Sequence, residues 1–275
     1  MNFLVLLLIL ALEKLCRWRV HLQRDGLFRR ILGRLEHSAR FKEQPAVQLL
    51  LVLGLPLALL GLLLWSLAPL AYGWLLLPLH VGLVLWSLGR SDPQHSLAPF
   101  RTRWQRGDTE AAYLEAQRDL GVQAEDAPGL LRQVQGFLLW QAYEGFFAVI
   151  FWYALAGPLP AVAYRLLALL GEHAAGAELR RYAVRLRHVL DWLPARLLAL
   201  SLALAGNFVS ANRVLWPRLL DFPASAAQLV ADAGRAAGDT PAGEGGLETL
   251  DELWSLLQRA GLIWYSALAL GILLL

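Results

Sequence analysis

The feature that most constrains the fold is an apolar segment from Val47 to Leu67 that contains no charged side chain. A helix needs about 20 such residues to cross the hydrocarbon core of a bilayer. A second apolar segment, Tyr72–Leu88, follows after the short linker Ala68-Pro69-Leu70-Ala71, which predicts a tight helical hairpin. Because the bilayer interior offers no water to peptide groups, segments of this kind are expected to be helices.

The composition favours a polytopic α-helical membrane protein. Hydrophobic residues make up 57% of the 275-residue chain and charged residues 17%, against about 25% charged residues in soluble domains. Eleven tryptophans suit the aromatic belts at membrane interfaces. We therefore expect an all-α fold with about five to seven membrane-embedded helices, some short or re-entrant, in one membrane domain spanning residues 1–275, with the lipid bilayer as a partner.

Further apolar segments fit this expectation. Basic residues follow the N-terminal segment Asn2–Leu15 rather than precede it. This segment is therefore expected to be a retained helix and not a cleaved signal peptide. Gly157-Pro158-Leu159-Pro160 predicts a break, after which a short segment suits a re-entrant or tilted helix. The expected segments are Asn2–Leu15, Phe137–Ala156, Ala161–Leu170 and Gly261–Leu275, with a separate short amphipathic helix at Leu247–Gln258.

Three segments between the apolar runs are polar. Residues 16–45 are rich in arginine, so the positive-inside rule predicts a cytoplasmic loop, as it does for the arginines of residues 178–188. Within residues 16–45, apolar side chains at helical spacing predict an amphipathic helix on the anionic inner leaflet: Leu27, Phe28, Ile31, Leu32 and Leu35.

Residues 90–136 are expected to form the main cytoplasmic loop. Thr109–Leu120 predicts a capped helix within it, and Ala127-Pro128-Gly129 predicts a break. Residues 207–258 form a polar loop whose side of the membrane the charges do not decide.

Several functional classes are disfavoured. The net charge is +3, but the basic residues cluster beside apolar segments and form no basic-aromatic stripe, so nucleic acid is not an expected partner. Cys16 is the only cysteine, which excludes an intrachain disulfide. The six histidines show no i, i+4 pair, and the sequence lacks the glycine-rich and nucleophile motifs of nucleotide-binding and hydrolase folds.

Four ionisable residues lie in or beside apolar helices: Glu144, Arg165, Asp191 and Arg196. A charged residue at the centre of a membrane helix costs about 2.5–3.5 kcal/mol on insertion scales, so these side chains require partners. They either converge on a polar cavity open to the cytoplasm or form a structural salt-bridge network at the 157–160 break. Pro194 predicts a helix start or a break between Asp191 and Arg196. His80 is also intramembrane, and a packing role is favoured for it.

Two motifs resemble the AmpE family: W-Q-A-Y-E-G-F-F-A-V-I-F-W at Trp140–Trp152 and H-V-L-D-W-L-P-A-R at residues 188–196. The N-terminal E-K-L-C-R-W-R and the region around Asp221-Phe222 fit the same family, so the resemblance covers nearly the whole chain. It implies a bacterial inner-membrane, multi-pass regulatory protein that is linked to induction of β-lactamase and to cell-wall recycling.

The AmpE family in turn resembles the CobD/CbiB family, whose membrane enzymes join aminopropanol or its phosphate to cobyric acid with ATP and magnesium. The matching positions here are Glu144–Phe151, Ala163-Tyr164-Arg165 and Asp191–Leu197. Carboxylates of that family are lost where this chain has Ala168–Gly171 and Arg187-His188, which puts cobinamide synthesis in doubt. Its H-P-S-P-N segment is reduced to Phe222-Pro223-Ala224-Ser225.

These observations lead to two functional hypotheses. The first is a regulatory or sensor protein that binds a small anionic or muropeptide-like ligand. The second is an ATP- and magnesium-dependent amide-forming ligase with a changed substrate, in which Glu144 and Asp191 would hold the metal. A muropeptide carrier ranks below both, a homo-oligomer stays open, and no catalytic residue is assigned. The expected ligand-binding residues are Glu144, Arg165, Arg185, His188, Asp191, Trp192 and Arg196.

Overall fold

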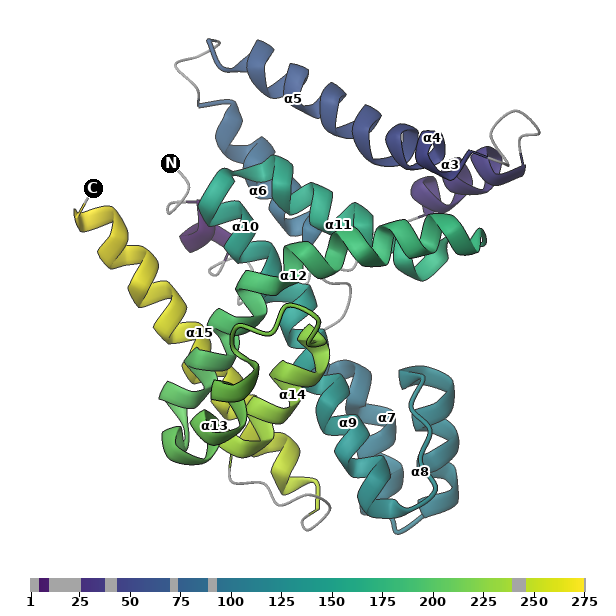
Figure 1. Cartoon of the computed structure of the whole chain (residues 1–275), viewed down its shortest axis with the longest axis vertical. Coiled ribbons are helices and arrows are strands. Elements are labelled where there is room, and N and C mark those ends of the chain that lie inside the picture. Colours follow the sequence, from purple (N-terminus) through teal and green to yellow (C-terminus); the bar gives the residue numbers. More distant parts are fainter. Residues whose placement is uncertain are drawn as a thin grey trace. The chain divides into compact units, whose positions relative to one another are not determined.

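The computed structural model confirms the all-α class. It describes residues 5–9, 26–37, 44–69, 74–88, 93–238 and 246–274, and within these ranges it contains helices and turns but no strand. The chain forms two compact units (Figure 1). Unit 1 comprises residues 1–90 and 148–191, and unit 2 comprises residues 91–147 and 192–275.

Three helices in the described part of the chain are long and apolar enough to cross a membrane, which confirms the multi-pass prediction. They have 23, 30 and 29 residues. A shorter apolar helix, α6 (Leu76–Ser87), is the second arm of the expected hairpin. The three long helices are Pro45–Leu67 (α4 Pro45–Leu49, η1 Leu50–Gly54, α5 Leu55–Leu67), Ala127–Ala156 (α9 Ala127–Ala142, η4 Tyr143–Phe147, α10 Ala148–Ala156) and α12 (Ala177–Ala205).

Unit 1 is built around α11 (Pro158–His173), which packs against α10, α6 and α5. Gly157, with φ of 82°, makes the reversal between α10 and α11 that the Gly-Pro-Leu-Pro sequence predicts. Pro56 follows the π-helical turn η1, whose wider ring relieves the crowding that a proline imposes on the preceding turn.

The amphipathic helix expected in residues 16–45 is present as α3 (Gly26–His37), and part of its apolar face packs on protein. Leu32 is buried in a cluster with Leu167 and Leu170 of α11 and Leu179 of α12. At its C-terminal end, the Glu36 carboxylate accepts hydrogen bonds from the amides of the turn between α11 and α12. Packing on these helices buries Leu32 and partly buries Phe28 and Leu35, whereas Ile31 is 50% exposed.

Unit 2 gathers around α9 and α14 (Ala226–Ala237), which pack against each other. Gly234 lets this pair approach closely, since a Cβ atom there would lie 2.7 Å from the Leu139 side chain. The remaining helices are α7 (Pro93–Gln105), α8 (Thr109–Glu115), η3 (Ala116–Leu120), α13 (Phe208–Leu215), η5 (Trp216–Arg218) and α15 (Glu248–Leu274).

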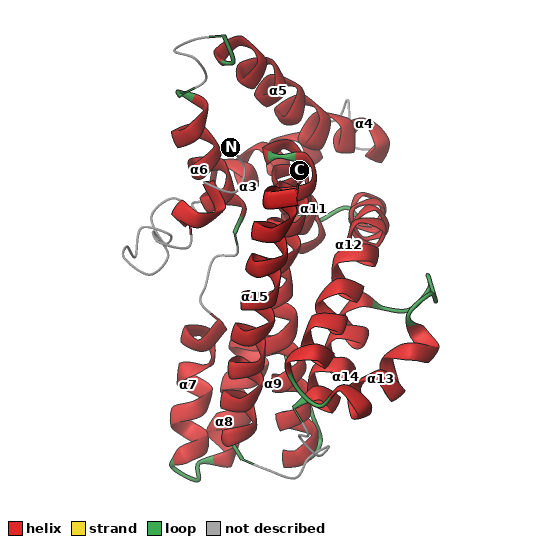
Figure 2. Cartoon of the chain, turned by 90° about the vertical axis from the view of Figure 1, so that its left-hand side faces the viewer, coloured by secondary structure: helices red, strands yellow, loops and turns green. Residues whose placement is uncertain are grey.

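Several boundaries differ from those expected. Pro128 does not break the chain but lies in the first turn of α9, where its missing amide is harmless and the Asp126 side chain caps the Gly129 amide. The cap of α8 is Asp108 rather than Thr109. Gly261 lies within α15, which is one continuous helix and not two (Figure 2).

The expected break at Pro194 is also wrong. Pro194 is buried inside α12, which is helical from Ala177 to Ala205. A proline removes one intrahelical hydrogen bond, and packing by neighbouring residues can compensate for that loss in a membrane helix.

Candidate functional site

Asp191 is the centre of a buried polar cluster in unit 1. Its side chain is held from two directions: the Tyr164 hydroxyl of α11 donates to Oδ1 at 2.7 Å, and Arg187 Nε lies 3.4 Å from Oδ2. Arg187 is one turn before Asp191 on α12, and its guanidinium lies 5.7 Å from the centre of the Tyr164 ring. We refer to Tyr164, Arg187 and Asp191 as the Asp191 cluster.

The cluster is mostly buried, but one of its side chains reaches solvent. Asp191 is 4% exposed, whereas the Arg187 side chain is 17% exposed. Arg165, the next residue after Tyr164 on α11, is 9% exposed. Asp191 and Arg187 thus form an ion pair that is largely shielded from solvent, and Arg165 is a second buried arginine on α11.

Arg196 lies in unit 2 and makes a different set of contacts. Its guanidinium donates to the carbonyl oxygens of Trp192 at 2.8 Å, of Asp221 at 2.5 Å and of Leu219. It also stacks over the Trp192 ring at 4.5 Å, and that ring packs against Phe222. Arg196 thus fastens residues 219–222 to the second half of α12, and we call this arrangement the Arg196 latch.

The other predicted site residues are placed as follows. Glu144 lies in the π-helical turn η4 of unit 2 and is partly buried. Arg185 has an exposed side chain on α12, so it does not share the buried setting of Asp191. His188 and Trp192 are partly buried on the same helix. Among the predicted residues, Asp191 therefore contacts Arg187 and Tyr164. Trp192 contacts Arg196.

The family described as "Regulatory signalling modulator protein AmpE" matches residues 1–264. The chain belongs to the AmpE family. Together with the long apolar helices, this membership confirms the predicted multi-pass inner-membrane protein with a regulatory role.

The comparison with curated proteins gives this AmpE-family chain a second, weaker relative. It is 33% identical over 192 residues to "Cobalamin biosynthesis protein CobD" of Stutzerimonas stutzeri (strain A1501), a match that covers 66% of this chain. The match spans 61% of the length of that relative. This confirms the distant resemblance to CobD. No solved structure matches the chain.

Tyr164 and Arg187 of the AmpE-family protein were not recognised from the sequence as partners of Asp191. Tyr164 belongs to a family motif, and a tyrosine beside an arginine in an apolar helix is the available signal. Another tyrosine, Tyr153 of α10, lies with its hydroxyl 3.0 Å from Nδ1 of the buried His80. That contact supplies the partner which the favoured packing role for His80 required.

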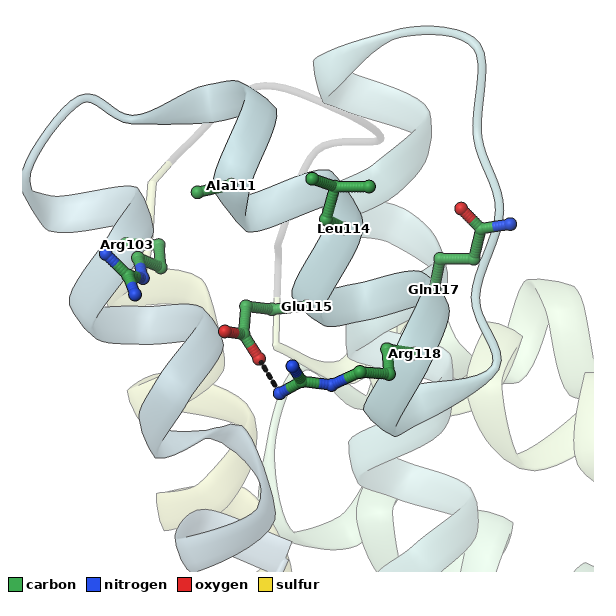
Figure 3. A pocket seen from close by; sticks show the side chains of 6 residues that line it. All are labelled: Arg103, Ala111, Leu114, Glu115, Gln117 and Arg118. Atoms are coloured by element: carbon green, nitrogen blue, oxygen red, sulfur yellow. Dashed lines mark hydrogen bonds and ion pairs between the residues drawn. The ribbon is translucent and has the colours of Figure 1, made fainter.

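Two further features bear on where a ligand could bind. No group of three or more His, Cys, Asp or Glu side chains that could hold a metal ion occurs among the residues that the structure describes. A surface hollow of about 560 Å³ lies in unit 2 and contains none of the predicted site residues. Arg118 at its edge is paired with Glu115 at 2.7 Å (Figure 3) and with Asp119 at 2.8 Å. The residues that line it are Arg103, Ala111, Leu114, Glu115, Gln117 and Arg118.

Proposed function

We propose that this AmpE-family protein is a membrane sensor that binds a small anionic ligand through Arg165 and Arg187, with the Asp191 cluster as the core of its site. The buried contact between Arg187 and Asp191 is the observation that carries the proposal. Muropeptide-like fragments are the proposed ligand class because they carry carboxylates, and the resemblance links the family to cell-wall recycling and β-lactamase induction.

The contacts of Arg187 suggest how a ligand would be sensed. Its 3.4 Å separation from Asp191 is longer than the roughly 2.7–2.9 Å of a close charge-assisted hydrogen bond. A ligand carboxylate could therefore compete with Asp191 for this guanidinium, while Tyr164 keeps its 2.7 Å bond to the Asp191 side chain. Such an exchange would change the contact between α11 and α12 and so report ligand binding as a change in helix packing.

The test is thermal unfolding of the detergent-purified protein titrated with soluble muropeptides from digested peptidoglycan. A saturating ligand at a hundred times its Kd adds about 2.7 kcal/mol to stability. We expect a saturable rise in Tm for the parent and none for Arg187→Gln. Arg106→Gln, at an exposed position of unit 2, is the matched control and should behave like the parent. An equal rise in Arg187→Gln, or no rise in the folded parent, would contradict the proposal.

A second candidate function rests on the 33% identity to a cobalamin biosynthesis protein. In this alternative the protein is an ATP-dependent amide-forming ligase with a changed substrate, in which Asp191 is a magnesium ligand and the arginines bind phosphate. Nucleotide turnover separates the two functions, since a sensor does not need it. Magnesium-dependent release of ADP from ATP that Asp191→Asn abolishes would favour the ligase. Its absence in folded parent protein, across the candidate amine and acid substrates, would favour the sensor.

A further inference from the structure

One face of α12 carries an exposed apolar stripe. Its five side chains are spaced by four, three, four and four positions, so helical periodicity places them on the same side of the helix. They are between 37% and 57% exposed. We call this row the α12 stripe: Tyr182, Leu186, Val189, Leu193 and Leu197.

Basic side chains border the stripe along the first half of α12. Arg181, Arg185 and His188 each precede a stripe residue by one position, which puts all three along the same edge. Arg181 lies 3.1 Å from Glu178, and both side chains are 57% exposed, so this pair is open to solvent. Arg185 is also exposed. An apolar stripe with a cationic border is the surface of a helix that lies in the headgroup region of a membrane.

We propose that the α12 stripe and its basic border bind an anionic phospholipid of the cytoplasmic leaflet. The phosphate lies against Arg181 and Arg185, and an acyl chain follows Leu186, Val189 and Leu193. Two observations favour lipid over a soluble partner. The stripe continues without interruption into the apolar half of a helix long enough to span the bilayer, and its border complements the charge of that leaflet.

This inference goes beyond the proposed sensor function because it concerns the opposite side of α12. The Asp191 cluster lies on the buried side, where Asp191 is 4% exposed, whereas the stripe faces outward. It also changes the expected role of residues 178–188. Residues 178–188 are not a loop but the first turns of α12, which this proposal places at the membrane surface. Arg185 then binds the lipid headgroup rather than a ligand in the buried site.

The first experiment measures lipid binding to the full-length protein by native mass spectrometry. Phosphatidylglycerol is compared with phosphatidylcholine of the same acyl chains, for the parent and for the double variant Arg181→Gln/Arg185→Gln. An arginine near an anionic membrane surface is worth about a 5-fold change in affinity, so the preference for phosphatidylglycerol should fall by about 5-fold for each arginine removed. The matched control is Arg103→Gln/Arg106→Gln, which removes the same charge from exposed positions of unit 2.

Equal binding of the two lipids by the parent would overturn the proposal. So would an unchanged preference in the double variant, or an equal loss in the control. Because the double variant could fail to fold, a second measurement is independent of it. A spin label is attached at Val189→Cys in a Cys16→Ser background and examined in phosphatidylglycerol vesicles. Faster relaxation of the spin label by oxygen than by a water-soluble nickel chelate would support the placement of the stripe in lipid. Faster relaxation by the nickel chelate would show that the stripe faces water, as a surface for a protein partner would, and would refute the proposal.

Discussion

Replacing Arg196 separates its role as a latch from its expected role as a ligand-binding residue. Arg196→Met keeps a long apolar side chain but removes donors to three carbonyl oxygens, those of Trp192, Leu219 and Asp221. Hydrogen bonds from a charged group contribute about 1.5–3 kcal/mol each. Leu219 and Asp221 lie in a partly exposed turn whose carbonyls can return to water, so we take about 1 kcal/mol for each bond, below that range.

The expected loss of stability is therefore about 3.5–4 kcal/mol, made up of about 1 kcal/mol for each hydrogen bond and 0.5–1 kcal/mol for stacking on Trp192. At about 2–4 °C per kcal/mol for a chain of this size, Tm should fall by roughly 7–16 °C. The loss should appear without any ligand present. Limited chymotrypsin digestion should also cut after Leu219 or Leu220 sooner, because residues 219–222 are no longer held against α12.

Arg213→Met, an exposed arginine of α13, is the control and should leave both readouts unchanged. Arg196→Lys should recover part of the stability, because a single ammonium group can satisfy only some of the carbonyls. A folded Arg196→Met protein with parental Tm and parental digestion would refute the latch. If that same protein had lost binding of an anionic ligand, Arg196 would belong to the ligand site after all.

Three further changes test local structure. Gly206→Val should lower stability by about 1–3 kcal/mol, measured by thermal unfolding, because its Cβ would run into the Ala237 carbonyl oxygen. Asp108→Ala should lower it by about 1 kcal/mol through loss of the α8 cap. The pKa of Asp119 lies below its ordinary value because Arg118 donates a hydrogen bond to its carboxylate, and an NMR titration of Arg118→Gln should show it raised. The stabilising effect of this pair is present above the ordinary aspartate pKa and is lost as pH falls through the depressed one.

Matched changes make these tests decisive. Gly261→Ala in α15 meets no neighbouring atom and should be neutral or stabilising, so a loss equal to that of Gly206→Val would contradict the close-approach argument. Thr109→Ala should leave the α8 cap intact, and a greater loss there than at Asp108 would restore Thr109 as the cap. An unchanged Asp119 pKa in Arg118→Gln would show that another group lowers it.

The sequence predicts the helices best where few alternatives exist. A charge-free run such as Val47–Leu67 can satisfy its peptide groups in a bilayer only as a helix, and it is one. Breaks were harder to predict, because the effect of proline or glycine depends on position. Gly157 does end a helix, whereas Pro128 starts one and Pro194 lies inside one. Only packing with residues distant in sequence decides between these outcomes.

The candidate site was predictable in part for a related reason. The energetic penalty of a charge in an apolar helix identifies a side chain that needs partners, but it does not say which partners. Opposite charge predicts that Glu144 and Asp191 pair with the arginines. The structure instead gives Asp191 a tyrosine hydroxyl as its closest partner and gives Arg196 three backbone carbonyls.

The partner of His80 follows the same pattern. It is the neutral hydroxyl of Tyr153, 73 positions away in the sequence. A neutral partner or a backbone carbonyl satisfies a polar side chain in the membrane without bringing a second charge out of water, and therefore avoids a second desolvation penalty. Asp191 combines such a neutral partner with a neighbouring guanidinium, whereas Arg196 contacts backbone carbonyls. This is the reason for placing the proposed anion site at the Asp191 cluster rather than at Arg196, and ligand titration of Arg187→Gln beside Arg196→Met distinguishes the two positions directly.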